Sequence, residues 1–424
     1  MLRKLVRDLP LVLYIFYVIY TPAPDTNVLT SKFVVLTVLA GVLLIPYVLS
    51  GDRGVWNLLS RPAVMILMVA TFAGSIYLMF VRVASGEPVE SLIDLRIVQN
   101  NVLNLMIVNV AIIVDQLKKR GYSKRQSFEV LLWLGSFQGI FSIAGLFIPW
   151  VRNISYTLYQ ASGSDNIFVM QSRIFGLTGD FTYGTPIYHG VLAGVAFYYL
   201  VKSRTNYLVH IVLIMSVAAM NGRTGLVVFV VMAIFTIVGT YGKRGNLLGM
   251  GAALLALVAA GAAAMSFLGD ISPATHRFVM SFLDDTRRLL FEGEATGNYG
   301  ALFEGFARAP DGFGLLFGTG ERVYDGEPGF NSDIGFTNDL YAGGLTYVLF
   351  VYLVFLAFLI RNSRGHALLS LELVLVFFLA NFKGEVFRSS VILFIFLFIK
   401  LVSSREDVEP ETSTGKIGRQ YARR

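Results

Sequence analysis

Cysteine is absent from this chain of 424 residues, and charged residues make up only 15% of it. Without cysteine, disulfides and thiolate metal sites are excluded. The four histidines show no metal-ligand spacing, so we expect no histidine-based metal site and no cofactor. The charged fraction lies well below the roughly 25% of soluble domains, which argues against a soluble protein.

Long apolar segments take the place of the missing charge. Hydrophobic residues make up 55% of the chain. Their runs recur at about 20 residues, the length that crosses a hydrocarbon layer of about 30 Å. The alternating strands of a membrane barrel are absent. The sequence predicts an all-α polytopic membrane protein with twelve spans, at residues 9–20, 28–49, 62–84, 97–114, 128–150, 185–201, 207–220, 225–241, 247–268, 341–360, 367–381 and 389–401.

Basic residues in alternate connections predict the orientation. Arg3, Lys4 and Arg7 precede the first apolar run, which resembles a signal peptide but lacks an A-x-A site, so an uncleaved first span is expected. The positive-inside rule then places both termini in the cytoplasm. The chain divides into residues 1–268 with nine spans and a short outer loop at 151–184, a large outer loop at 269–340, three spans within 341–402, and a cytoplasmic tail, 403–424, expected to be disordered.

The predicted outer side carries an unusual set of basic residues. Eleven of its thirteen are arginine, against 14 Arg and 8 Lys on the predicted inner side. Arginine presents a planar fork that holds phosphate through two parallel hydrogen bonds. A lipid-linked phosphate is therefore the expected ligand, and ion pairs with acidic residues of the same loops are the alternative.

Residues 273–291 of the large loop predict an amphipathic helix, capped by Ser272 and followed by Gly293. Arg277, Ser281, Asp284 and Arg288 fall on one face, and apolar residues fall on the other. Such a helix would lie in the outer interface and present guanidinium groups. Arg277 and Arg288 are about 16 Å apart and cannot grip one diphosphate together. An Asp284–Arg288 ion pair is the alternative reading. His276 and Arg287 lie on the same helix.

Two shorter segments also offer polar groups to a head group. A glycine-rich stretch from Arg173 to Gly184 suggests a flexible loop presenting Arg173, Asp180 and Tyr183. A glycine-rich turn with one solvated arginine is the alternative. Residues 221–225 predict a five-residue outer hairpin holding Arg223 at the mouth of the bundle, where a snorkelling arginine in a plain turn is equally plausible.

The last part of the large loop supplies carboxylates and a glycine run. A reaction in which a hydroxyl group attacks the substrate needs a carboxylate or histidine to take the hydroxyl proton. Asp333 and Asp339 lie nearest the bundle, and Asp333 is the first choice; a solvated or capping aspartate is the alternative. Lys383 and Arg388 lie in the last outer turn, at the predicted rim of the site. Residues 312–320 lack the Gly-Lys-Ser/Thr of a phosphate-binding loop and predict a close-packed turn.

Taken together, these features resemble a known family. They are the twelve spans with two unequal outer loops, Arg173 with Gly184 eleven residues on, and the motifs Asn221-Gly-Arg-Thr-Gly225, Phe317-Gly-Thr-Gly320 and Asn331-Ser-Asp-Ile-Gly335. From about Phe128 to Leu401 the chain resembles the Wzy-type O-antigen and exopolysaccharide repeat-unit polymerases, of the O-antigen polymerase and ligase superfamily.

The resemblance implies a GT-C-like fold and a metal-independent, inverting glycosyltransferase at the periplasmic face of the bacterial inner membrane. Such an enzyme moves a glycan from undecaprenyl diphosphate onto the terminal sugar of another lipid-linked repeat unit. Its partners would be the lipid-linked donor and acceptor, membrane lipid and a chain-length regulator, with no nucleic acid. Arg173, Arg277, Arg288 and Asp333 would be catalytic. Substrate-binding residues would be Asp180, Tyr183, Arg223, His276, Arg287, Lys383 and Arg388.

Two other functions stay open at this point. One is a ligase that moves the same donor onto lipid A core or protein; the sister ligases use a loop histidine, and the surroundings of His276 do not match that pattern. The other is a lipid-linked oligosaccharide flippase or transporter. Transporters show repeated halves and several intramembrane charges. This chain shows no repeat, and Glu372 is nearly its only charge deep in a predicted span.

Overall fold

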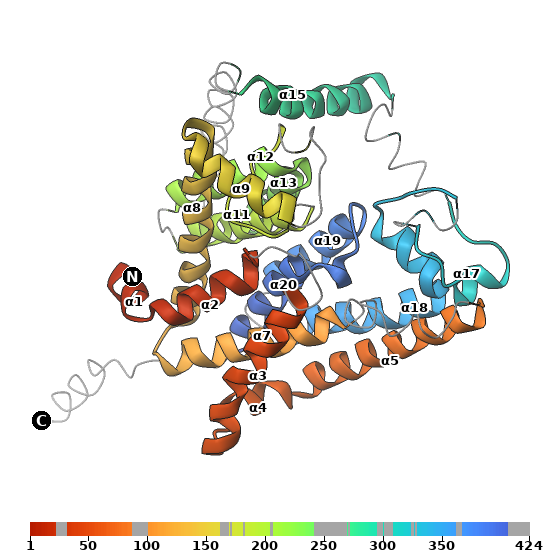
Figure 1. Cartoon of the computed structure of the whole chain (residues 1–424), viewed down its shortest axis with the longest axis horizontal. Helices are drawn as coiled ribbons and strands as arrows, with labels where there is room; N and C mark the ends of the chain where they lie inside the picture. Colours follow the sequence, from red (N-terminus) through yellow and green to blue (C-terminus); the bar gives the residue numbers. More distant parts are fainter. Residues whose placement is uncertain are drawn as a thin grey trace, which may run out of the picture.

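A computed structural model describes residues 1–22, 32–86, 101–161, 169, 172–180, 183–203, 207–240, 269, 272–294, 300, 308–323, 326, 329–361 and 367–405 (Figure 1). Within these ranges every element is a helix. Eleven predicted spans coincide with helices: α2 (Leu9–Tyr20), α3 (Lys32–Ser50), α5 (Pro62–Ala84), α7 (Val102–Lys119), α8 (Lys124–Phe147), α11 (Gly184–Ser203), α12 (Leu208–Asn221), α13 (Arg223–Thr240), α18 (Gly335–Ile360), α19 (Ala367–Asn381) and α20 (Ser390–Ser403). The predicted span at residues 247–268 lies outside the described ranges.

The other helices are shorter and lie between these or at the chain's beginning. They are α1 (Leu2–Arg7), α4 (Gly54–Leu59), α9 (Pro149–Ala161), α15 (Pro273–Arg287), a π-helical turn (Arg288–Glu292), α17 (Phe313–Phe317) and the 3-10 turn η4 (Val386–Arg388). The predicted amphipathic helix is confirmed as α15 with its π-helical continuation, and Gly293 ends it in the left-handed conformation. Ser272 bonds the Thr275 hydroxyl at 2.8 Å and does not cap the backbone as predicted.

Four of the described helices are long and apolar enough to cross a bilayer, at Phe33–Ser50, Pro62–Ala84, Lys124–Phe147 and Gly335–Ile360. Large apolar side chains on α5 face outward at helical spacing: Ile66, Val69, Phe72, Ile76 and Phe80 are all exposed. A continuous exposed apolar stripe of this kind calls for a lipid environment. The described part of the chain is therefore all-helical, with helices suited to a membrane.

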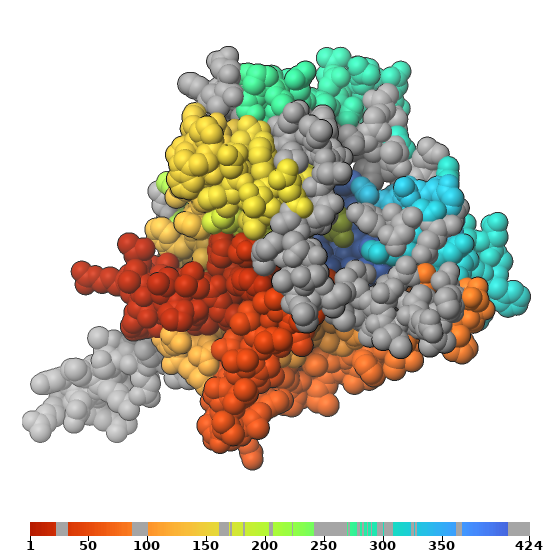
Figure 2. Space-filling model, in the orientation of Figure 1, coloured from red at the N-terminus to blue at the C-terminus, as the bar shows by residue number. Residues whose placement is uncertain are grey.

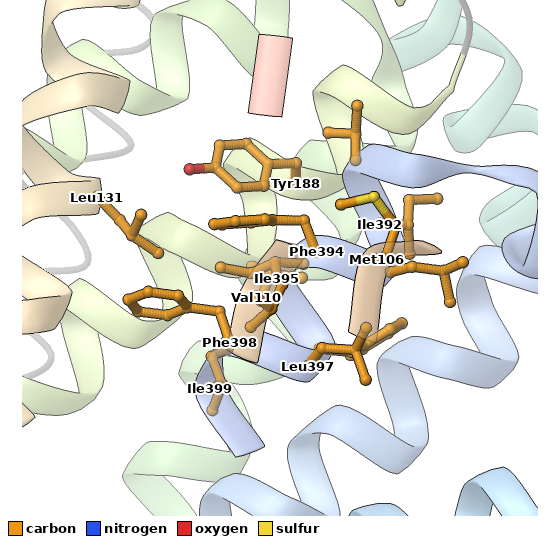
Figure 3. Packing of buried hydrophobic residues seen from close by; sticks show 14 of the residues in the cluster. Met106, Val110, Leu131, Tyr188, Ile392, Phe394, Ile395, Leu397, Phe398 and Ile399 are labelled. Atoms are coloured by element: carbon orange, nitrogen blue, oxygen red, sulfur yellow. The ribbon is translucent and has the colours of Figure 1, made fainter. Parts of the chain in front are cut away.

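The centre of the bundle is α20. Its residues from Val391 to Leu397 are completely buried, as expected for a helix that is apolar on every side. It packs against α2, α7, α8 and α11. Figure 3 shows Phe394 and Phe398 of α20 among Val110, Leu131 and Tyr188 from three of these neighbours. The last predicted span is therefore the helix around which the others assemble.

Glycines bring α11 and α13 into direct backbone contact. A Cβ atom on Gly190 would lie 2.2 Å from the carbonyl oxygen of Gly225, and one on Gly225 would lie 2.1 Å from that of Pro186. Small residues allow such close approach between membrane helices. This contact fixes the position of α11, whose first residue is Gly184.

Two predicted loops are shorter than the sequence suggests. The fifth span ends at Phe147 instead of residue 150, because Pro149 begins the separate helix α9. Residues 151–161 are thus helical where a loop was predicted. The predicted five-residue hairpin at 221–225 is also wrong, since α12 ends at Asn221 and α13 begins at Arg223, with Gly222 alone between them.

Helix α18 begins before the predicted span at 341 and is interrupted within it. It starts at Gly335, so Asp339 lies inside the helix and not in the loop. The interruption is at Gly344, whose φ is +66°. Gly318, with φ +85°, packs directly on the backbone of residues 342–344. Only glycine adopts these angles readily and admits this approach. The close packing predicted for the loop at 312–320 is found from Gly318 onward, whereas residues 313–317 form the helix α17, in which Phe313 is 82% exposed.

Hydrogen bonds between connecting segments sort these segments to two ends of the bundle. We call the end holding Asp8 and Arg405 the terminal end, where Arg405 donates to the Tyr122 carbonyl at 2.7 Å. We call the opposite end the loop end, where the Gly179 N–H donates to the Tyr20 carbonyl at 2.7 Å. Both contacts join segments that the positive-inside rule places on the same side.

Asp8 is the centre of a charged cluster at the terminal end. It accepts hydrogen bonds at 2.9 Å from each of Arg7, Arg120 and Tyr122, and it is only 3% exposed. The hydrogen bond from Arg7 is the main cause that lowers the pKa of Asp8 to about 2, from an ordinary value of 3.8; burial opposes this shift and Arg120 supports it.

This cluster predicts a loss of stability in acid. Because the folded pKa lies below the unfolded one, the contribution of Asp8 is complete above about pH 4 and disappears as the pH falls toward 2. Thermal unfolding in detergent between about pH 5 and pH 2.5 should show a steeper fall in midpoint for the wild type than for Asp8→Asn. Parallel curves for the two proteins would contradict this prediction.

Candidate functional site

Residues 172–180 cross the loop end as an anchored segment. The Ile174 N–H donates to the Met220 carbonyl at 3.3 Å, and the Gln138 side chain donates to the Phe175 carbonyl at 2.9 Å. With the bond from Gly179 to Tyr20, these contacts fix the segment against the ends of α12 and α2 and the middle of α8. The flexible loop suggested by the sequence is therefore corrected to a fixed one.

This path separates the three polar residues predicted there. Arg173 is half-buried and precedes the residue bonded to the end of α12. Asp180 is buried, and its N–H bonds the Thr178 hydroxyl at 3.1 Å. Tyr183 lies just before α11, and its hydroxyl donates to the Glu385 carbonyl at 3.0 Å. Tyr183 thus reaches the turn between α19 and α20, whereas Arg173 lies toward the α12–α13 turn.

Two arginines converge on one carboxylate in that turn. Arg388 bonds Oε1 of Glu385, and Arg322 bonds Oε2 at 3.0 Å. The side chains of Arg322, Glu385 and Arg388 are 18%, 8% and 15% exposed. Arg322 precedes α18 and Arg388 ends η4, so the pair of guanidinium groups joins the end of the large loop to the last turn of the chain.

Beneath this pair lies a second buried carboxylate, on α18. The Tyr352 hydroxyl donates to Oδ2 of Asp339 at 2.6 Å and lies 3.2 Å from Oδ1 of Asn381. Asp339 is 3% exposed, and its charge interacts with that of Arg388. We call Tyr183, Arg322, Asp339, Tyr352, Glu385 and Arg388 the Glu385 cluster.

The protonation states in the cluster follow from burial and charge. Burial alone would lower the pKa of Arg388, but the neighbouring charges of Glu385 and Asp339 outweigh it and raise the pKa above its ordinary value. Burial, together with the charges of Glu385 and Asp180, raises the pKa of Tyr183 well above its ordinary value. Arg388 therefore stays cationic and Tyr183 stays a hydrogen-bond donor.

Glycines make room for the cluster. A Cβ on Gly384 would lie 1.9 Å from the ring of Tyr183, and one on Gly184 would lie 2.1 Å from Oδ2 of Asp180. Both distances are far below any real contact of a Cβ atom. The aromatic ring and the carboxylate are therefore positioned by the absence of side chains beneath them.

Asp333 and Lys383 form an ion pair at the rim of the cluster. Their Oδ2 and Nζ atoms are 2.9 Å apart, and Asp333 is 57% exposed. The pair joins the segment before α18 to the turn that holds Glu385. Asp333, the predicted base, is thus brought together with Lys383, one of the two predicted rim residues, and its carboxylate has access to bulk water.

Helix α15 forms the outermost described layer at the loop end, above α9 in this view (Figure 2), and it contacts α12. Its arginines have partners on the same stretch of chain. Arg288 pairs with Asp284 at 3.3 Å, as the alternative reading predicted, and Arg287 pairs with Glu292 at 3.1 Å. Arg277 bonds the Pro273 carbonyl at 3.4 Å. His276 is half-buried, and the side chain of Arg223 is not among those described.

Of the residues predicted for the site, Tyr183 and Arg388 meet in the Glu385 cluster, and Lys383 and Asp333 meet beside it. The sequence reasoning missed Tyr352 and the convergence of Arg322 and Glu385. Arg322 belongs to the predicted outer arginines and Glu385 lies two residues after Lys383, but nothing local in the sequence links the two. Two partly buried cations around one carboxylate are chemically suited to receive a larger anion such as a diphosphate.

Two of the described histidines, His189 and His210, have structural partners. His189 lies 3.1 Å from the Tyr20 hydroxyl and 2.7 Å from the Thr185 carbonyl, and His210 lies 2.7 Å from the Ser136 hydroxyl. Among the described residues, no group of three histidine or acidic side chains is placed to hold a metal ion.

Comparison of the chain with family models, with curated proteins and with solved structures gives no match.

Proposed function

We propose that this protein is a membrane glycosyltransferase of the polysaccharide-polymerase class, which uses a lipid-diphosphate-linked glycan as donor at the loop end. The observation that carries the proposal is the convergence of Arg322 and Arg388 on Glu385 at the edge of an apolar bundle. A polyprenyl diphosphate has the matching chemistry, since its chain belongs in lipid and its phosphates belong beside guanidinium groups. The resemblance of the sequence to repeat-unit polymerases names the same substrate.

In this proposal Glu385 holds the two guanidinium groups in place until the donor arrives. A diphosphate carries more negative charge than one carboxylate, so it competes for the donors of Arg388 and Arg322. As the bond between the anomeric carbon and the diphosphate oxygen breaks, charge develops on the leaving group. Cations already fixed beside it stabilise that charge without reorganisation.

The acceptor sugar enters from the rim. Its hydroxyl oxygen attacks the anomeric carbon from the face opposite the diphosphate, which inverts the configuration, and its proton passes to a carboxylate. Asp333 is proposed as that base, because it is exposed beside the cluster and Lys383 holds its carboxylate. Asp339, which is buried against Tyr352, has a different role: its negative charge raises the pKa of Arg388 and so favours the cation.

The predicted arginines outside the cluster are assigned to the lipid head groups. Arg277, Arg287 and Arg288 on α15, with His276 beside them, would meet the second lipid-linked glycan. Arg173 and Arg223 would do so from the α12–α13 turn, whereas the charge of Asp180 acts on Tyr183. Holding two amphiphiles head to head in this way supplies the proximity that a bimolecular transfer needs.

A reconstituted assay tests the proposal. Purified protein in vesicles receives a synthetic undecaprenyl-diphosphate repeat unit, with a chelator in place of metal. A ladder of longer glycans is the expected product. A single transfer to a different acceptor would replace this function with that of a ligase, and movement of the intact substrate across the vesicle without bond formation would replace it with transport.

A further inference from the structure

A pocket of about 610 Å³ opens at the terminal end, away from the Glu385 cluster. Residues of α4, α5, α7, α18 and α20 line it, so it lies where the ends of five helices meet. In Figure 1 this region is found where α4 passes into α5. Its volume falls in the usual range of small-molecule sites, roughly 300–1,000 Å³.

The charge of the pocket is strongly positive. One carboxylate, Asp115, lines it and is paired with Lys119 at 2.6 Å while accepting a hydrogen bond from Tyr47 at 2.7 Å. Lys119 lies outside the lining and also pairs with Asp52, so the charge of Asp115 is only partly compensated and is set against the cations of the lining. The cations that line the pocket are Arg61, Lys118, Arg361, Lys400 and Arg405.

These cations are held by several elements. Lys400 is 6% exposed and donates to the carbonyls of Leu359 and Arg361 at the end of α18. Arg405 is 4% exposed and donates to the Tyr122 carbonyl. Arg61 donates to the Ser404 hydroxyl at 2.8 Å. Lys118 and Arg361 are exposed at the mouth. The pocket thus carries positive charge both at its buried wall and at its exposed mouth.

The beginning of α5 adds to this field. The Arg61 carbonyl accepts from the N–H groups of Val64 and Met65 at 2.9 Å, and Pro62 is the first helical residue. Ala63 and Val64 of this first turn line the pocket. The N-terminus of a helix carries partial positive charge and favours anions. The helix end and the five cations therefore both favour a negatively charged ligand.

The remaining wall is apolar. Leu58, Val64, Val114, Phe358 and Leu401 line it, and the exposed apolar face of α5 continues beside it. An anion that also carries apolar groups can contact both the basic wall and the apolar wall of the pocket. Basic pockets between membrane helices bind the head groups of anionic lipids in this way.

We propose that this pocket binds a phosphate group, and that the phosphate belongs to an anionic phospholipid of the surrounding leaflet. The apolar wall favours the lipid over free phosphate, which offers the same anionic chemistry without acyl chains. The inference is independent of the glycosyltransferase proposal, since the pocket lies at the opposite end of the helices.

Delipidated protein in a neutral detergent tests this inference. Phosphatidylglycerol, phosphatidylcholine or inorganic phosphate is added, with the thermal midpoint and the number of bound lipids by native mass spectrometry as readouts. We expect phosphatidylglycerol to bind and raise the midpoint, with phosphatidylcholine much weaker. In the double variant Lys118→Gln/Arg361→Gln, whose positions are exposed, the apparent affinity should fall by roughly tenfold or more.

The matched control is Arg3→Gln/Lys124→Gln, which removes the same charge from the terminal end without touching the pocket lining. This variant should keep the wild-type affinity. If inorganic phosphate stabilises the wild type and this effect is lost only in the pocket variant, the pocket is a phosphate site whose ligand is free phosphate and not a phospholipid. Equal losses in both double variants, or no preference for the anionic lipid or phosphate, would overturn the proposal.

Discussion

Replacing Arg388 with alanine is expected to abolish glycan elongation and to destabilise the protein by about 3 kcal/mol. The substitution leaves Glu385, 8% exposed, paired with Arg322, and it removes one of the two guanidinium charges that act on Asp339. Breaking a buried ion pair costs about 3–5 kcal/mol because the other charge stays buried. Arg322 offsets part of this loss, so the lower end of the range applies.

A double substitution distinguishes the effect of Arg388 on activity from its effect on stability. In Arg388→Met/Glu385→Gln both charges are gone, and Arg322, 18% exposed, keeps only the neutral amide oxygen at position 385 as an acceptor, so the thermal midpoint should recover part of its loss. The ladder should stay absent, because a methionine cannot stabilise a departing diphosphate. Arg388→Lys should retain a small part of the activity, since lysine keeps the charge but not the planar fork.

A partly exposed pair at the terminal end provides the control for both readouts. Arg125 and Glu129 form an ion pair at 3.0 Å in which the arginine is about half exposed, and Glu129 keeps a hydrogen bond from the Tyr207 hydroxyl at 2.8 Å when the arginine is removed. Such pairs contribute at most about 1 kcal/mol, so Arg125→Ala should leave the midpoint nearly unchanged and the ladder intact. A paired Arg388/Glu385 variant with normal elongation would limit Arg388 to a structural role.

The parts of this fold that the sequence predicted are those determined within one segment. Pro62 and the apolar run after it set the bounds of α5, which the structure matches to the residue. The amphipathic period of α15 and Gly293 beyond it are equally local. The Asp284–Arg288 pair spans one helical turn and was foreseen for the same reason.

The Glu385 cluster was not predictable in this way because its contacts are distant along the chain. Arg322 lies 63 residues and Tyr183 lies 202 residues from Glu385. The sequence supplied the arginines and the turn, but only packing selects Arg322 and Arg388 from eleven outer arginines. Helix α9 was missed for another reason: its polar residues, including Asn153 and Ser155, gave the composition of a loop.

Substituting Gly190 with alanine should be among the most damaging single changes in the bundle. The new Cβ would lie 2.2 Å from the oxygen and 3.0 Å from the Cα of Gly225, both of which are backbone atoms. No side chain can rotate to relieve this clash, so α11 and α13 must separate. Overpacking typically costs about 1–3 kcal/mol, and a backbone clash should reach the upper end. The thermal midpoint of purified protein in detergent measures the loss.

The same substitution should also lower elongation, because α11 begins at Gly184, beside Tyr183 and the Glu385 cluster. Gly41→Ala is the matched control: it lies within α3 and its Cβ would meet nothing within 4 Å. Alanine is the better helix former by about 0.5–1 kcal/mol, so this variant should equal or exceed the wild-type midpoint and elongate normally. If Gly190→Ala and Gly41→Ala behaved alike, the α11–α13 contact would not be the constraint that positions the site. A Gly190→Ala protein that is destabilised yet elongates at the wild-type rate would instead show that the Glu385 cluster holds Tyr183 without help from α11.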